Sequence, residues 1–337
     1  MLYCELVNFL GGFLYFMVLF IFMSFGLVAL ILFGSLIIDS IQVQSLFLLA
    51  IFLLLSFLFY SQVIKEWTKS KKRLINLHSV DLKPLFFLLL GTFASFFINH
   101  NLGMGAVIGS SVVGLIGSLL FKPHATSIYC GSFIGMACSI IFANPLSLVT
   151  AAVVSSILFV LSKDVLIGYG GKLGFLAFSG CYVASVLFQT PFRVVSPLTS
   201  EWYPFIFLYV IGAGLATFAV QKEWKLDAVQ ASALVGLTLA LIHPDSANTV
   251  VVAAFCATFT GMMSPEKVKG YREMFVLSLI TSILFIAAFS LFDGSGGKLG
   301  SIAFLSTVSG LALVRYSKQV INYIIKKKKD TPSSSQI

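Results

Sequence analysis

The chain is built almost entirely from apolar runs separated by short polar turns. Twelve runs can be distinguished, at about 9–37, 44–64, 84–99, 103–121, 126–143, 146–162, 172–190, 203–220, 228–242, 247–263, 274–292 and 298–315. A helix needs about 20 apolar residues to cross a bilayer, and in lipid a helix satisfies all of its own backbone hydrogen bonds. The sequence therefore predicts an all-α polytopic membrane protein with ~12 transmembrane helices. The run at 9–37 is long enough for one tilted helix or for a tight hairpin.

Composition and charge support this class. Hydrophobic residues make up 58% of the chain, charged residues 10%, and the mean hydropathy is +0.99, whereas a soluble domain has about 25% charged residues. The net charge of +9 comes from lysines and arginines in short turns and in the tail, which is typical of topology signals and not of nucleic-acid binding. We expect the lipid bilayer and a small solute as partners and no nucleic acid, and the chain can act as a monomer or a homo-oligomer. The expected location is the bacterial plasma membrane.

One unit of sequence occurs twice. The pentapeptide Gly-Gly-Lys-Leu-Gly stands at 170–174 and again at 296–300, in each case before an apolar run. Two further matches align Gly114 with Gly236 and Gly135 with Gly261, at offsets of 122 and 126 residues. One short insertion reconciles these offsets. Internal duplication in a membrane protein is typical of transporters and channels.

The positive-inside rule gives the orientation. If the loop after the second run is cytoplasmic and the sides alternate from there, all basic residues except Arg193 and Lys298 fall on the cytoplasmic side, the C-terminus included. Each copy then holds five runs, an odd number, so the two copies enter the membrane in opposite directions. The predicted organisation is a transmembrane pair with a basic loop (1–83), a first five-span repeat (84–191), an external linker (192–202), a second, inverted five-span repeat (203–316) and a basic disordered tail (317–337).

The repeated pentapeptide is the main candidate site. Its glycines permit a tight turn with exposed N–H groups, the following helix presents its positive end, and the lysine adds a full charge, so the motif can bind an anion. The alternative is a helix-start turn with glycines for close packing and a lysine that reaches the headgroups. The topology places the two motifs at opposite faces of the membrane. The candidate substrate-binding residues are Gly170, Gly171, Lys172, Gly174, Gly296, Gly297, Lys298 and Gly300.

Two proline turns, which follow the aligned runs in each copy, supply the remaining candidates. They carry His124 in the first copy and His243 with Asp245 in the second. A histidine can act as a proton-sensitive gate, or these turns can simply begin helices. Since they fall on opposite sides of the predicted bundle, one shared catalytic site is not expected, and we expect no enzymatic activity.

The runs contain almost no ionisable residues, and we expect none at mid-membrane. This argues against a carboxylate-driven antiporter. Four cysteines, namely Cys130, Cys138, Cys181 and Cys256, lie inside apolar runs without a CxxC pattern, so we expect packing roles and no metal.

The five-plus-five organisation is similar to that of urea transporters, of related membrane flavoprotein subunits and of several ion-coupled carriers. This similarity concerns architecture alone. The segment 124–127, His-Ala-Thr-Ser, lacks the glycine of the covalent flavin motif in those subunits, so no cofactor is expected. We expect a transporter or channel that moves a small polar or anionic solute between the two repeats. The alternatives are a membrane subunit of a redox or envelope-assembly complex without transport activity of its own, and a membrane-embedded transferase or hydrolase.

Overall fold

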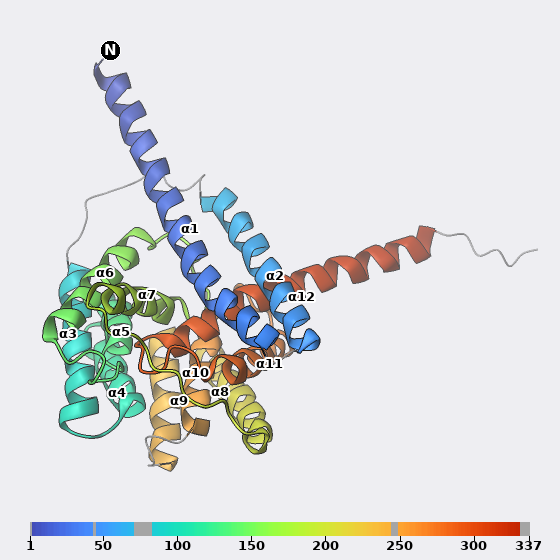
Figure 1. The fold of residues 1–337 in the computed structure, drawn as a ribbon. Coiled ribbons are helices and arrows are strands. Elements are labelled where there is room, and N and C mark those ends of the chain that lie inside the picture. The colour runs from blue at the N-terminus through green and yellow to red at the C-terminus, as the bar shows by residue number, and fades with distance from the viewer. Residues whose placement is uncertain (1, 43–44, 71–82, 244–248, 331–337) are drawn as a thin grey trace, which may run out of the picture.

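The computed structural model describes residues 2–42, 45–70, 83–243 and 249–330 (Figure 1). In these ranges the chain is helical, and its extended pairing is limited to an isolated bridge between Arg193 and Asp293. The α-helices are α1 (Leu2–Gln42), α2 (Leu46–Ser70), α3 (Lys83–Phe96), α4 (Ala106–Leu120), α5 (Ala125–Ile134), α6 (Pro145–Leu161), α7 (Lys172–Leu187), α8 (Tyr203–Glu223), α9 (Ala228–Ile242), α10 (Thr249–Gly261), α11 (Tyr271–Ala288) and α12 (Lys298–Asp330).

Six of the described helical segments are long and apolar enough to cross a membrane, which indicates a membrane-embedded protein. They are Phe22–Gln42, Leu46–Thr68, Lys83–Asn101, Ser200–Glu223, Tyr271–Ala288 and Lys298–Lys327. The first apolar run is one continuous helix and not a hairpin.

Two of the predicted spans are much shorter than their apolar runs. Helix α5 has 10 residues and α10 has 13, so at 1.5 Å per residue they cover about 15 and 20 Å of a hydrocarbon core of about 30 Å. The run at 126–143 therefore does not form one helix, because the chain leaves the helix after Ile134 and turns repeatedly through 135–144. Apolar composition alone does not reveal such a break, since the irregular segment is itself largely apolar.

Local sequence explains where several helices begin. Asn144 accepts a hydrogen bond from the N–H of Leu146 at the start of α6, with Pro145 in the first turn. Asp227 accepts bonds from the N–H groups of Val229 and Gln230 at the start of α9, both at 2.9 Å. Both are standard N-caps.

The two duplicated regions pack in the same way. Helix α3 lies along α5 as α8 lies along α10, α6 packs on α7 as α11 packs on α12, and α4 and α5 meet as α9 and α10 do. The regions contact one another where α4 meets α9 and where α7 meets α12. The N-terminal pair α1 and α2 packs mainly on α12 through α2 (Figure 1).

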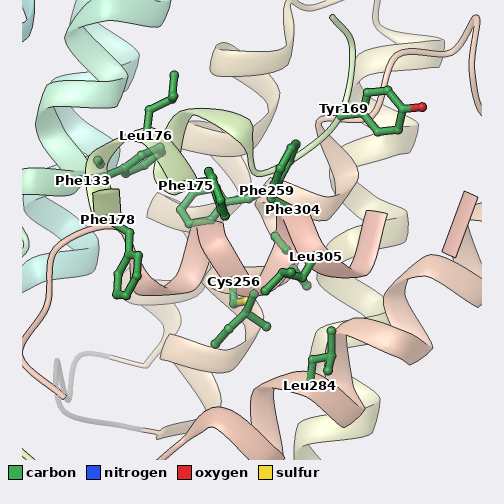
Figure 2. Close-up of a cluster of buried hydrophobic side chains, with 14 of the residues drawn as sticks. Phe133, Tyr169, Phe175, Leu176, Phe178, Cys256, Phe259, Leu284, Phe304 and Leu305 are labelled. Atoms are coloured by element: carbon green, nitrogen blue, oxygen red, sulfur yellow. The ribbon is translucent and has the colours of Figure 1, made fainter. Parts of the chain in front are cut away.

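Buried aromatic side chains fill the centre of the bundle. Figure 2 shows phenylalanines from four helices gathering there: Phe133 of α5, Phe175 and Phe178 of α7, Phe259 of α10 and Phe304 of α12. The rings of Phe175 and Phe304 lie 4.9 Å apart between centroids. In a lipid environment such interdigitation stabilises helix association through packing contacts.

The C-terminal segment differs from the expectation of disorder. Helix α12 continues to Asp330, and its last turns extend away from the bundle (Figure 1). Residues 331–337 lie outside the described residues. The predicted cytoplasmic loop at 65–83 is likewise partly helical, because α2 continues to Ser70; residues 71–82 are outside the described residues.

Candidate functional site

Each Gly-Gly-Lys-Leu-Gly motif forms the start of a helix. Helix α7 begins at Lys172 and α12 at Lys298. The residue before each lysine has a left-handed backbone, with φ of +80° at Gly171 and +79° at Gly297. Only glycine adopts this conformation without steric cost. The second glycine of the motif is thus required by the turn that starts the helix.

The two motifs contact each other in the middle of the bundle. A Cβ added to Gly171 would lie 2.4 Å from the carbonyl oxygen of Gly300, and one added to Gly297 would lie 2.3 Å from that of Gly174. A Cβ on Gly174 would lie 2.5 Å from the Cα of Gly300. The expectation that the motifs occupy opposite faces of the protein is therefore wrong. Alternation of helix directions could not show that both connections fold back into the bundle before their helices begin.

Each first glycine contacts the short helix of the other copy. An added Cβ would meet the carbonyl oxygen of Phe259 at 2.4 Å for Gly170, and that of Phe133 at 2.7 Å for Gly296. The motif of each copy therefore packs on the short helix of the other, α10 or α5.

Both lysines cap the C-terminus of the preceding helix. The Lys172 ammonium donates to the carbonyl of Ser162, the C-cap of α6, at 2.5 Å, and also to the carbonyl of Val165. The Lys298 ammonium donates to the carbonyl of Phe289, the C-cap of α11, at 2.7 Å. A cation is favourable at the negative end of a helix dipole.

These contacts show where the lysine side chains point. Their side chains point into the protein and do not reach out to headgroups. The bundle interior therefore contains two lysine side chains where the sequence predicts no ionisable group. No carboxylate in the described residues forms an ion pair with either one. Backbone carbonyls contact each ammonium directly, and the carboxylates of Asp164 and Asp293 act electrostatically on Lys172 and Lys298 from further away.

Each motif lines its own cavity. The α6–α7 cavity, of about 270 Å³, is bounded by Gly171 and Lys172 and by the connection at 162–171. The α11–α12 cavity, of about 260 Å³, is bounded by Gly297 and Lys298 and by the connection at 289–297. As in any helix, the first N–H groups of α7 and α12 lack intrahelical partners, and the N-cap Gly171 offers no side chain to them. Both cavities therefore combine a helix N-terminus with a lysine, a combination suited to an anion.

Two phenylalanines separate the cavities. Phe133 of α5 and Phe259 of α10 line both of them, and their ring centroids are 4.6 Å apart (Figure 2). The rings of Tyr129 and Phe255, one helical turn earlier, contact them in tilted and edge-on geometry, with centroids 4.4 and 4.7 Å away. The short helices α5 and α10 thus place aromatic rings between two cavities whose walls are mainly apolar.

Sequence reasoning missed both of these phenylalanines. The signal was present, because Phe133 and Phe259 are related by the 126-residue offset that aligns Gly135 with Gly261. Nothing in their local sequence distinguishes them from the other phenylalanines of the chain.

Matching hydrogen bonds occur in the two copies, at an offset of 126 residues for every member except Ser110 and Ser232, which are 122 apart. Cys130 and Cys256 donate to the carbonyls of Leu173 and Leu299, at 3.3 and 3.1 Å. The hydroxyls of Ser110 and Ser132 are 2.8 Å apart, and those of Ser232 and Thr258 are 2.9 Å apart. The cysteines thus have a positioning contact in addition to the packing role that the sequence predicts.

The histidine candidates lie elsewhere. His124 stacks on Phe87 with ring centroids 4.0 Å apart, and His243 accepts from or donates to the Tyr209 hydroxyl at 3.0 Å. Neither histidine lines one of the two cavities, and Asp245 is outside the described residues. Across the described ranges, no group of three or more His, Cys, Asp or Glu side chains is placed to hold a metal ion.

Comparison with known proteins gives no relative: no protein-family model, curated protein or solved structure matches the chain.

Proposed function

We propose that the protein is a membrane transporter or channel that moves a small polar or anionic solute through the two cavities, along the interface of two inverted repeats. The observation that carries the proposal is the pair of cavities that share the Phe133–Phe259 barrier. A transporter that opens to each side of the membrane in turn needs one cavity on each side of a barrier.

The matched contacts of the two copies support the inverted repeat. The amides of Asn99 and Gln221 both reach the carbonyl that ends the short helix of their own copy, Gly135 at 3.5 Å and Gly261 at 3.3 Å. Beyond α5 the chain continues to Ala137, whose carbonyl is 2.8 Å from a ring nitrogen of His100, in the π-helical turn Phe97–Asn101 that follows α3. A short helix plus the segment that follows it thus extends as far as a neighbouring candidate span, which fits five crossings per copy and ~12 in all.

The charges that line the path favour an anion. The lysine, arginine and acidic residues that line the α6–α7 cavity are Lys163 and Lys172, and those that line the α11–α12 cavity are Arg193, Asp293 and Lys298. Arg193 and Asp293 form an ion pair at 3.8 Å. With the lysines protonated, each cavity has an excess of positive charge, which raises the local concentration of anions.

The test is uptake by proteoliposomes with a panel of small anions and neutral solutes. We expect Lys172→Ala and Lys298→Ala each to lower anion uptake about ten-fold or more, because a charge-assisted hydrogen bond contributes about 1.5–3 kcal/mol. Lys222→Ala, which alters an exposed lysine on α8, is the control and should keep normal uptake. Uptake near normal in the double alanine variant, at matched protein level, would contradict the proposal.

A further inference from the structure

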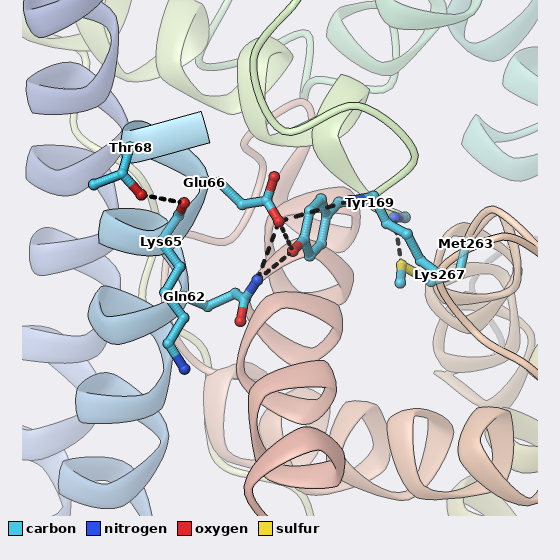
Figure 3. A network of polar contacts seen from close by, with 8 residues as sticks. Gln62, Lys65, Glu66, Thr68, Tyr169, Met263 and Lys267 are labelled. Carbon is cyan, nitrogen blue, oxygen red and sulfur yellow. Dashed lines mark hydrogen bonds and ion pairs between the residues drawn. The ribbon is translucent and has the colours of Figure 1, made fainter. Parts of the chain in front are cut away.

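A buried polar cluster joins the N-terminal helix pair to one of the two cavities. Gln62 and Glu66 lie one turn apart on α2 and are almost fully buried, with exposed fractions of 0% and 8%. The Gln62 amide donates to the Tyr169 hydroxyl at 2.7 Å and to Glu66 at 3.2 Å, and the Tyr169 hydroxyl donates to Glu66 at 3.2 Å (Figure 3). Burial, and secondly the nearby Glu66 charge, raise the pKa of Tyr169 above its ordinary value, so this hydroxyl stays protonated and remains a donor.

A third element completes the cluster. Lys267, in the connection between α10 and α11, places its ammonium 3.8 Å from the Glu66 carboxylate and 4.4 Å from the centre of the Tyr169 ring. Arg315 of α12 also acts electrostatically on Tyr169. The buried carboxylate thus has an amide, a phenol and a cation around it, as a buried charge requires.

Tyr169 belongs to the wall of the α6–α7 cavity. It follows Ser162 and Val165, whose carbonyls hold the Lys172 ammonium, and it directly precedes the Gly-Gly-Lys turn. Tyr169 itself lines the cavity. Whatever fixes Tyr169 therefore fixes the turn that presents Lys172.

The connection before α12 in the second copy has no counterpart of the Tyr169 attachment, although it shares a backbone hydrogen bond with the first copy. In both copies one backbone bond holds the connection: Ser264 N–H to the Gly168 carbonyl at 3.0 Å, and Cys138 N–H to the Gly294 carbonyl at 2.9 Å. The counterpart of Tyr169 at the 126-residue offset is Ser295, which cannot reach as far.

The second connection has a different additional attachment. The backbones of Arg193 and Asp293 exchange two hydrogen bonds, at 3.1 and 3.0 Å. One cavity wall is thus held by side chains of α2, and the other by backbone pairing with the segment between α7 and α8.

We propose that Glu66 and Tyr169 are positioning residues that hold the wall of the α6–α7 cavity, and that the N-terminal helix pair thereby controls access to this side of the path alone. The role in transport rests on the proposed function. The geometry that it predicts can be measured without any transport.

Two reporter cysteines measure the effect on each side. In a chain whose native cysteines are replaced by serine, Ala228→Cys reports on the α6–α7 cavity and Val252→Cys on the α11–α12 cavity; both positions are half-buried cavity residues. With Glu66→Ala or Tyr169→Phe, we expect a small thiol reagent to modify position 228 about ten-fold faster, the factor for losing one hydrogen bond to a charged group, and position 252 at an unchanged rate. Glu66→Gln, which can keep the bond from Tyr169, should give a smaller increase.

The control is Ser309→Ala, because the Ser309 hydroxyl bonds the Leu55 carbonyl of α2 at 2.9 Å without contacting the 162–171 connection. It should leave both reporters unchanged. An unchanged rate at 228, or the same increase at both positions, would overturn the proposal.

A second measurement avoids the reporter chain. Hydrogen exchange on the protein with its own cysteines should rise in 162–171 and not in 289–297 when Glu66 is replaced by alanine, and exchange that rises equally in both would count against the proposal. If exchange rises only in 162–171 and proteoliposomes take up none of the solutes, the positioning role is supported and the transport function is refuted.

Discussion

At the scale of single residues, the centre of the molecule depends on glycines at which no other residue fits. Gly171 and Gly297 combine a left-handed backbone with backbone atoms of the opposite motif 2.4 and 2.3 Å from an added Cβ. The conformation and the contact are separate requirements, and both exclude a side chain.

We therefore expect Gly171→Ala and Gly297→Ala to destabilise the protein strongly. The left-handed conformation costs about 1–2 kcal/mol for a residue with a Cβ, and overpacking a close contact costs about 1–3 kcal/mol more. Thermal unfolding in detergent measures the effect as a lower midpoint. Gly212→Ala is the matched control, because an added Cβ on this α8 residue has nothing within 4 Å; equal midpoints for the three variants would contradict the prediction.

For the two lysines, the sequence predicts which residues matter but not what surrounds them. Lys172 and Lys298 attract attention in the sequence because they recur in one motif. Their acceptors are carbonyls seven to ten residues earlier, at Ser162 and Val165 for Lys172 and at Phe289 for Lys298. No side-chain pattern marks a carbonyl as an acceptor.

At the scale of elements, the short helices α5 and α10 determine where the barrier lies. Each packs along a longer neighbour, α3 or α8, and each presents one phenylalanine to the other across the interface.

Replacing a barrier phenylalanine should join the two cavities. We expect Phe133→Ala and Phe259→Ala to admit larger solutes in proteoliposome uptake, because each ring lines both cavities. Their stability should fall by about 3–5 kcal/mol, as for other buried Phe→Ala changes.

The control for this prediction is Phe304→Ala. Phe304 is equally buried, with an exposed fraction of 0%, and lines neither cavity. It should lose similar stability and keep the size limit of the parent protein. If all three variants admit the same solutes, the barrier does not lie between Phe133 and Phe259.

At the scale of the whole molecule, the orientation of the two copies in the membrane is the main open prediction. The inverted arrangement places the linker at 192–202 outside and the α10–α11 connection inside. Thr199→Cys and Lys269→Cys, both at exposed positions, should therefore react with an impermeant reagent from opposite sides of the membrane, in a chain without its native cysteines. Reaction of both from one side would refute the inverted repeat.

The sequence by itself determined the membrane class, the helical content, the duplication and the residues of the repeated motif. These depend on local properties, namely apolar composition, the backbone needs of glycine and identity at a fixed offset. Helix starts such as Asn144 and Asp227 belong to the same group, because a cap contacts residues only two or three positions away.

Only the tertiary structure decided that the two motifs meet, that the lysines bind helix-end carbonyls, that Phe133 and Phe259 form a barrier, and that Glu66 reaches Tyr169. Each of these contacts joins residues from different helices or from a connection that folds back into the bundle. In a chain in which nearly every segment is apolar, hydrophobicity does not select one partner over another. The choice is made by close backbone packing at glycines and by a few buried polar groups that must find hydrogen-bond partners, and both can be seen only when the helices are assembled.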